Sequence, residues 1–353
     1  MAQNRTSSVA VPANFDRTRV VAARNPMAPP LVPRIVIEAL PALLMKIKTG
    51  RYDEFGQPQS AEKQVANALQ NMSVMYKTVG KAHYLPQPDF EDPAFHVAYV
   101  YQYLTKHCHL IYQMLWMLLP FGIATQWLER GVNVCSIGGG PGTDVIGVLV
   151  YLRSLRSYLD KPASERVIGY VLDKFADAWT GTWQDIRASN SVLRESQIYC
   201  RYISCDLLDD LPTAAMEEEI READLVTMVK AFSAFIAFMR DGRDIRQCAV
   251  SKLLMQLKRG AVVLFIDNMD ELYLKRRAAP SWRLRKSQNE TFLQDIVQPA
   301  GLISLGEWHG STNTWVMKDS HLQLKRYIQE RFHLDWSTGL RKCAVSVFLL
   351  YKP

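Results

Sequence analysis

A glycine-dense turn at Asn133–Asp144, reading Asn-Val-Cys-Ser-Ile-Gly-Gly-Gly-Pro-Gly-Thr-Asp, constrains the fold more than any other segment. Its glycines let a backbone turn sharply and approach a ligand closely. The pattern after it, Val145–Leu155, predicts a helix whose positive N-terminal end faces the turn. The segment therefore predicts a strand, a ligand-binding turn and a helix. No Lys-Ser or Lys-Thr follows the glycines, which disfavours a nucleoside triphosphatase, and the spacing is not the G-x-G-x-x-G of a dinucleotide oxidoreductase.

Short apolar runs recur after this turn, most of them separated by helical patterns. Such alternation predicts a mainly parallel sheet covered by helices on both faces, an α/β fold over residues 131–353. The predicted strands are Val134–Ile137, Arg166–Leu172, Ile198–Ser204, Asp224–Val229, Ala261–Asp267, Ile303–Trp308 and Ala344–Tyr351.

The chain before the turn has helical periodicity. Apolar residues recur at helical spacing over Ile35–Lys48 and Ala61–Val79. A longer helix, Ala94–Leu119, is predicted to start with Asp92 as its cap and Pro93 in its first turn. We expect residues 36–130 to form a helical cap domain, which also offers a surface for a protein partner.

Two acids follow consecutive predicted strands. Asp173 comes directly after Val167–Leu172, and Asp206 with Leu207 follows the third strand. In an open α/β sheet, ligands bind at the carboxyl ends of the strands, where Asp173 is placed to bind ribose hydroxyls and Asp206 an adenine edge. Either acid alone also fits a helix cap.

In this order, the features resemble those of the class I S-adenosylmethionine-dependent methyltransferases. The resemblance implies a Rossmann-like seven-strand sheet, mostly parallel with an antiparallel last strand. It also implies S-adenosylmethionine as cofactor, with the glycine loop around its methionine part. The residues that it assigns to the cofactor are Ser136, Gly138, Gly140, Gly142, Asp173, Asp206 and Leu207.

The chain departs from this family at two points. Ser136 stands where the family usually has an acid, and about 30 residues separate the glycine loop from Asp173, more than the roughly 20 of comparable units. A first helix lengthened by Tyr151–Lys161 would accommodate the gap. The missing acid keeps open the alternative of a non-catalytic S-adenosylmethionine-binding regulatory protein.

The acceptor side is read from the segment after the fourth strand, Val229-Lys-Ala-Phe-Ser-Ala-Phe235. It lacks the Asn or Asp followed by Pro-Pro and an aromatic residue of many amine-methylating enzymes, which disfavours methylation of the adenine amine. Lys230 is a candidate catalytic residue that would neutralise negative charge or lower the pKa of an imide or hydroxyl; a solvated helix start is the alternative. Phe232 fits either base stacking or the core, and His309 is a candidate base.

The positive charge of the chain is local. Of a formal net charge of +7, residues 1–34 carry five arginines against one aspartate, and Leu272–Asn289 carries six cations and no acid. Because that second segment follows the fifth strand, we expect it beside the crevice, where cations and aromatic rings suit RNA. A solvated loop is the alternative. The candidate RNA-binding residues, besides Phe232, are Lys275, Arg276, Arg277, Trp282, Arg283, Arg285 and Lys286.

A further likeness concerns the acceptor. The segments Ala98–Leu104, Ser136–Gly140, Asp224–Met228, Phe265–Asn268 and Val347–Lys352 look similar to a fungal family that methylates a ring nitrogen, N3, of uridine in large-subunit ribosomal RNA. This likeness implies rRNA modification. A small-molecule or protein methyltransferase remains the alternative.

The remaining patterns concern metals and location. Adjacent helix positions point apart, so His107-Cys108-His109 predicts no metal site. Six separated cysteines predict reduced core thiols in an intracellular protein, cytoplasmic or nuclear. No membrane span is expected, because the apolar stretch Leu110–Thr125 is short and interrupted. Residues 1–35 predict a disordered basic arm, although a mitochondrial presequence has a similar composition.

Overall fold

The computed structural model describes residues 31–48, 51, 56–78, 89–161, 166–209, 211–239, 243–269, 287–311, 315–332 and 344–353. Nearly all of the predicted N-terminal arm and most of the predicted basic segment therefore lie outside the described residues.

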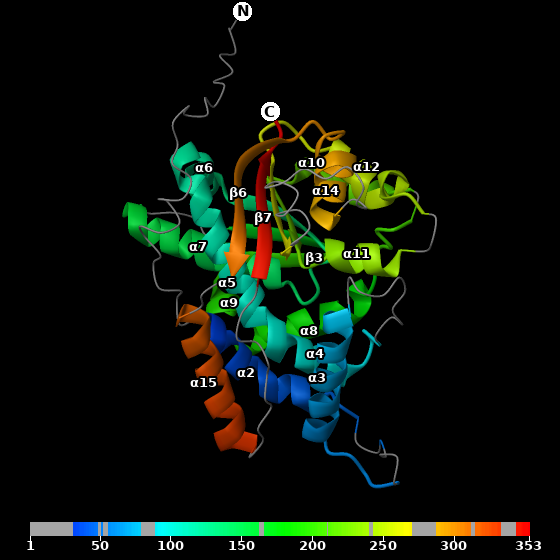
Figure 1. Ribbon diagram of the computed structural model, residues 1–353. Coiled ribbons are helices and arrows are strands. Elements are labelled where there is room, and N and C mark those ends of the chain that lie inside the picture. Colours follow the sequence, from blue (N-terminus) through cyan, green and yellow to red (C-terminus); the bar gives the residue numbers. More distant parts are fainter. Residues whose placement is uncertain are drawn as a thin grey trace, which may run out of the picture.

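A single seven-stranded sheet forms the centre of the molecule (Figure 1). Its strands are β1 Val132–Ile137, β2 Val167–Asp173, β3 Ile198–Ser204, β4 Leu225–Val229, β5 Val262–Asn268, β6 Ile303–Ser311 and β7 Ala344–Tyr351. The strand order is β3-β2-β1-β4-β5-β7-β6, and only β7 runs antiparallel to its neighbours. The structure thus confirms the predicted Rossmann-like seven-strand sheet with an antiparallel last strand.

Helices cover both faces of the sheet, because successive side chains of a strand point to opposite faces. In β1, Val134 belongs to one hydrophobic core and its neighbour Cys135 to the other. The first core lies against α6 Ile123–Arg130, α7 Thr143–Leu159, α8 Ala176–Ser189 and the N-terminal helices. The second lies against α10 Ala214–Glu222, α11 Phe232–Phe238, α12 Ala249–Met255 and α14 Gln288–Phe292. α7 is long, as the gap between the glycine turn and Asp173 requires.

The N-terminal helices share a core with the sheet. α2 Leu31–Met45 begins inside the segment predicted as the arm, and α3 spans Ala61–Thr78. α2 lies side by side with α15 Trp315–Phe332, which connects β6 to β7 (Figure 1). Buried side chains of α2, α7 and β1 belong to one hydrophobic cluster. The division into a cap domain and a methyltransferase domain stays a prediction.

The predicted helix Ala94–Leu119 is one helical run with a change of pitch. It consists of α4 Pro93–Tyr99, a π-turn Val100–Leu104, α5 Thr105–Leu115 and a 3₁₀ turn Trp116–Phe121. Such π-turns occur often at functional sites, because one extra residue rotates the helix face.

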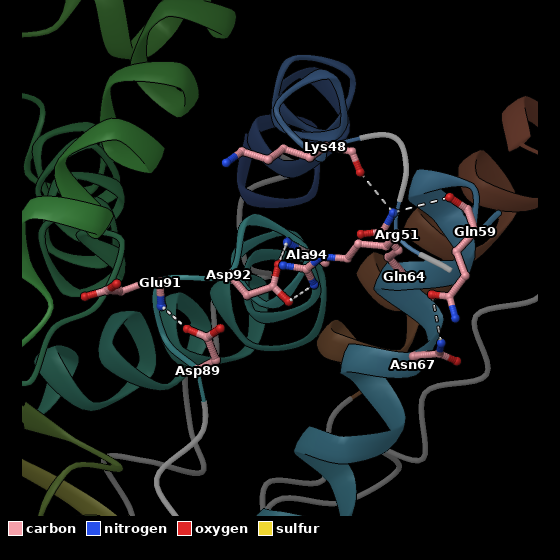
Figure 2. Close-up of polar contacts among 9 residues, drawn as sticks. All are labelled: Lys48, Arg51, Gln59, Gln64, Asn67, Asp89, Glu91, Asp92 and Ala94. Atoms are coloured by element: carbon pink, nitrogen blue, oxygen red, sulfur yellow. Dashed lines mark hydrogen bonds and ion pairs between the residues drawn. The ribbon is translucent and has the colours of Figure 1, made fainter. Parts of the chain in front are cut away.

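The start of α4 is capped as predicted (Figure 2). The Asp92 carboxylate accepts a hydrogen bond from the Ala94 amide at 3.0 Å and one from Arg51 Nη1 at 2.7 Å. The carboxylate thereby satisfies one of the amides that a helix start leaves unpaired.

No single described helix is long and apolar enough to cross a membrane. Pro93–Phe121 and Ile123–Arg130 reach that length and composition only as a pair, bent by 104°.

Candidate functional site

A cleft of about 420 Å³ opens at the carboxyl ends of β1 to β4. The strand order reverses between β1 and β4, and the crevice at such a point is where open α/β sheets bind ligands. The turn after β1, the ends of β2, β3 and β4, the start of α8, and residues of the N-terminal helical segment all contribute to its walls. The cleft therefore brings together segments that are far apart in the sequence.

The glycine turn after β1 forms part of the cleft wall. Gly138 and Gly140, with φ of 66° and 52°, line the cleft, as predicted for two of the three loop glycines. Gly142 also has a positive φ, 77°, but it lies outside the cleft lining, where a Cβ would meet the Trp183 ring at 3.0 Å and the Tyr202 hydroxyl at 3.1 Å. Gly142 thus permits close packing at the start of α7, rather than a contact with the cleft.

A buried polar cluster lies next to the glycine turn. Ser136 and Thr227 donate hydrogen bonds from their hydroxyls to Oδ2 of Asp144, at 2.7 and 2.6 Å. Burial raises the pKa of Asp144 to about 6, although the two hydroxyl bonds oppose the rise. Ser136 is therefore buried and not on the cleft surface, where the sequence predicted it. This chain has no acid at position 136, but it has a buried acid, Asp144, in the first turn of α7.

Asp173 links the end of β2 to the glycine turn. Its Oδ2 accepts a hydrogen bond from the Gly140 amide at 3.2 Å, and its Oδ1 accepts one from the Phe175 amide at 2.9 Å. Burial raises the pKa of Asp173, and the two amide bonds offset part of that rise. The residue lines the cleft and is 9% exposed. This placement next to the turn agrees with the predicted position of the acid.

Asp206 and Leu207 line the cleft at the end of β3. The Asp206 carboxylate accepts hydrogen bonds from Lys174 Nζ at 2.8 Å and from the Leu208 amide at 3.0 Å. Partial burial acts to raise the pKa of Asp206, but these two bonds and the charges of Lys174 and Arg243 outweigh it and hold the pKa below its usual value. Asp206 is thus an anion near neutral pH.

Aromatic residues that the sequence analysis did not assign to the site form a further wall. Phe90 stacks on Phe175 with ring centroids 4.7 Å apart, and both line the cleft beside Tyr99 and Trp179. A Cβ on Gly140 would lie 3.5 Å from the Tyr99 ring. The Tyr-rich helix near Tyr99 was a signal for this wall, but Phe90 and Trp179 carried none.

The end of β4 contributes Lys230, which lines the cleft as predicted. Its Nζ donates a hydrogen bond to Asn268 Oδ1 at 2.7 Å. Phe232 is fully buried between Phe265 and Phe292, so of its two predicted roles the core placement is confirmed and base stacking is wrong. Phe235, one turn later on α11, lines the cleft instead.

His309 does not line the cleft, against the prediction that it is an acceptor-side base. Its Nδ1 lies 2.9 Å from the Ser346 hydroxyl, and its Nε2 contacts Glu307. The predicted RNA-binding residues of the basic segment lie outside the described residues. They are Lys275, Arg276, Arg277, Trp282, Arg283, Arg285 and Lys286.

Within the described ranges, no group of three or more His, Cys, Asp or Glu residues could hold a metal ion. His107 and His109 are both buried in α5. Burial, with the nearby Lys230 and Lys106 charges, lowers the pKa of His107 to about 3. Its imidazole is therefore neutral.

No protein-family model matches the chain, and no curated protein matches it in sequence. A solved O-methyltransferase family protein from Burkholderia thailandensis is similar over 90% of this chain and 83% of that chain, with a TM-score of 0.41 and 15% identity. Magnesium protoporphyrin IX methyltransferase from Synechocystis PCC 6803, with bound S-adenosylmethionine, aligns over 82% of this chain and 97% of that chain, at a TM-score of 0.37 and 11% identity.

A third similar structure is a complex between the Haloferax volcanii Trm112 methyltransferase activator and the putative methyltransferase. The match covers 76% of this chain and 100% of the matched chain of that complex, with a TM-score of 0.33 and 16% identity. At these scores, the fold assignment rests on this chain's own strand order.

Proposed function

We propose that the protein binds S-adenosylmethionine in the cleft and transfers its methyl group to an acceptor. The observation that carries the proposal is the convergence of Gly138, Gly140, Asp173 and Asp206 on one cleft at the reversal of strand order. The residues fit such a ligand, because Gly140 leaves space between the turn and the Tyr99 ring that a side chain at position 140 would narrow. A cleft of about 420 Å³ is also within the usual range for small-molecule sites.

Each group has a role in this proposal. Asp173, held by two amides, would accept hydrogen bonds from the ribose, and the Asp206 and Leu207 segment would flank the adenine. Bound there, the cofactor would supply an electrophilic methyl group. The protein's contribution is to position the acceptor, and the aromatic wall of Phe90, Tyr99 and other rings excludes water.

Calorimetric titration with S-adenosylmethionine and S-adenosylhomocysteine tests the cofactor. We expect the wild type to bind both, and Asp173→Ala to bind at least about tenfold more weakly, because a bond to a charged group is worth about 1.5–3 kcal/mol. Asp177→Ala, which removes an exposed acid from the first turn of α8, is the matched control and should stay within about twofold. Absence of wild-type binding, or equal affinity for Asp173→Ala, would refute the proposal.

We propose RNA as the acceptor class, with a ring nitrogen of rRNA uridine as the specific candidate. The supporting observation is the end of β5 at Asn268, which lies on the same side of the sheet as the carboxyl ends of the strands that form the cleft. The six-cation segment follows Asn268 in the sequence. Clustered cations favour a polyanionic acceptor. A small-molecule or protein acceptor is the competing proposal.

Transfer of labelled methyl to cellular RNA, protein and metabolite fractions separates these acceptors. With RNA as acceptor, replacing the six cations by Ala should abolish labelling and leave S-adenosylmethionine affinity unchanged; exchanging Lys and Arg at the same sites is the control that keeps the charge. Label in protein or metabolites would refute RNA. Tight cofactor binding without any label would indicate the regulatory alternative.

A further inference from the structure

Lys230 has a backbone conformation that its place in the fold does not explain. Among the described residues, only Asp160 and Lys230 are non-glycine residues with positive φ, at 50° and 57°. Asp160 is the C-cap of α7, where that conformation is common. Lys230 lies between β4 and α11, and its amide donates to the Ile266 carbonyl at 2.7 Å. Strain of this kind is concentrated at functional sites.

The ammonium of Lys230 is hydrogen-bonded to a neutral group. Its hydrogen-bond acceptor, Asn268 Oδ1, is an uncharged amide oxygen. The neighbouring Asp267 is already engaged, because its carboxylate accepts from the Ser233 amide at 2.8 Å and from the Asn268 amide at 2.6 Å. On the α5 side, His107 is neutral and Lys106 is a second cation. Within the described part of the chain, Lys230 therefore forms no ion pair with a carboxylate.

Six charged residues of the described chain line the cleft, namely Asp173, Lys174, Asp206, Asp209, Lys230 and Arg243, and Lys174 forms an ion pair with Asp206. Asp173 and Asp206 are at the ends of β2 and β3, whereas Lys230 is at the end of β4, beyond the glycine turn of β1. If the ribose and adenine occupy the half with the two acids, the transferable methyl group lies toward the half with Lys230. Lys230 would then be next to the reacting atom of the acceptor.

We infer that the acceptor carries an acidic N–H or O–H, such as an imide, phenol or carboxylic acid, and reacts as its anion beside Lys230. The inference rests on the proposed function. Ala231, Ala234, Phe235 and Phe238 form the cleft wall next to Lys230, and such apolar surroundings strengthen its attraction for an anion. This assigns a chemical class of acceptor to the cleft.

The proton balance agrees with this assignment. The acceptor first releases its acidic proton to solvent, and the charge of Lys230 favours the resulting anion. The anionic nitrogen or oxygen then gives its electron pair to the methyl carbon, the pair of the broken carbon–sulfur bond stays on sulfur, and the methylated product is neutral. A neutral amine acceptor would leave a proton for a base to remove. An ammonium cannot accept that proton, and His107 is a poor base because burial and the nearby cations lower its pKa to about 3.

The test uses 4-nitrophenol, whose anion absorbs at longer wavelength than its acid, as a probe of protein saturated with S-adenosylhomocysteine. We expect the wild type to lower the apparent pKa of the bound probe by about one unit, as a cation a few ångströms away does. Lys230→Met should abolish the shift and Lys230→Arg should keep most of it. Asn268→Asp, which adds a counterion of nearly the same shape, should remove most of the shift while Lys230 is still present.

The outcomes separate the inference from the proposed function. A wild type that does not bind S-adenosylhomocysteine defeats the proposed function. A wild type that binds it, but binds the probe no better than Lys230→Met or leaves its pKa unshifted, defeats only the inference. Calorimetry on each variant shows how much protein is loaded, so a folding defect is not mistaken for a lost charge. Labelled methyl found on an amine nitrogen of the natural acceptor would also overturn the inference.

Discussion

The turns after β1 and β4 lie side by side at the carboxyl ends of adjacent strands, but their backbones bend in different ways. Each leads from a buried parallel strand into a helix. The β1 turn uses positive-φ glycines at Gly138, Gly140 and Gly142, and a buried acid, Asp144, supports it. The β4 turn has no glycine; it bends at Lys230 instead. The first turn makes room for a ligand, and the second presents a charge.

The tightest contact of the β1 turn predicts the largest effect. A Cβ on Gly139 would lie 2.0 Å from Ser136 Oγ and 2.8 Å from its Cβ, so Gly139→Ala must displace the strand or break the bond to Asp144. We expect a loss of about 3 kcal/mol or more in the free energy of unfolding, measured with urea. Ser136→Gly in the same chain should restore part of it.

Gly122→Ala is the control for this substitution. Gly122 has a φ of 68°, but no atom lies within 4 Å of its added Cβ, so only backbone strain of about 1–2 kcal/mol is expected. If Gly139→Ala destabilises the protein no more than Gly122→Ala, the β1 turn is looser than its packing indicates.

The buried acid of the β1 turn predicts a pH dependence of stability. The folded-state pKa of Asp144 is about 6 and its ordinary value is 3.8, so the folded protein binds this proton more tightly than the unfolded chain. The resulting stabilisation is fully present below pH 3.8 and is lost as the pH rises through about 6.

Comparison with Asp144→Asn isolates this contribution. Between pH 7 and pH 4, the wild type should gain about 2 kcal/mol in unfolding free energy relative to the variant. Asp177→Asn, an exposed site on α8, should show a relative change of less than about 0.5 kcal/mol. Parallel curves for wild type and Asp144→Asn would mean that folding does not raise the pKa of Asp144.

The sequence predicted the elements that local pattern determines. All seven strands were found, because β-branched runs such as Val167–Leu172 are bounded by polar residues, and Asp173 and Asp206 follow strands directly. The sequence could not show pairs that join distant segments, such as the Asp144–Thr227 bond or the stacking of Phe90 on Phe175. Nor could the sequence show that Phe232 is buried and Phe235, about one turn later on α11, lines the cleft.

The two non-glycine residues with positive φ in the described part of the chain provide the smallest prediction. Lys230→Gly and Lys230→Ala both remove the bond to Asn268 and differ only in the backbone cost at position 230. The positive φ costs an alanine about 1–2 kcal/mol of folding free energy. A glycine avoids this cost but loses more backbone entropy on folding, which offsets about 0.5–1 kcal/mol of its advantage. Lys230→Gly should therefore be more stable than Lys230→Ala by about 0.5–1 kcal/mol in urea unfolding.

The same pair of substitutions at Asp160, the C-cap of α7, measures the backbone effect far from the cleft. If glycine is favoured at position 160 but not at 230, the β4 turn relaxes once the lysine side chain is removed. The Asn268 hydrogen bond would then be what bends the backbone at Lys230 and directs the ammonium into the cleft. If glycine is favoured equally at both sites, the bend belongs to the turn itself, and the fold presents the charge whether or not Asn268 holds it.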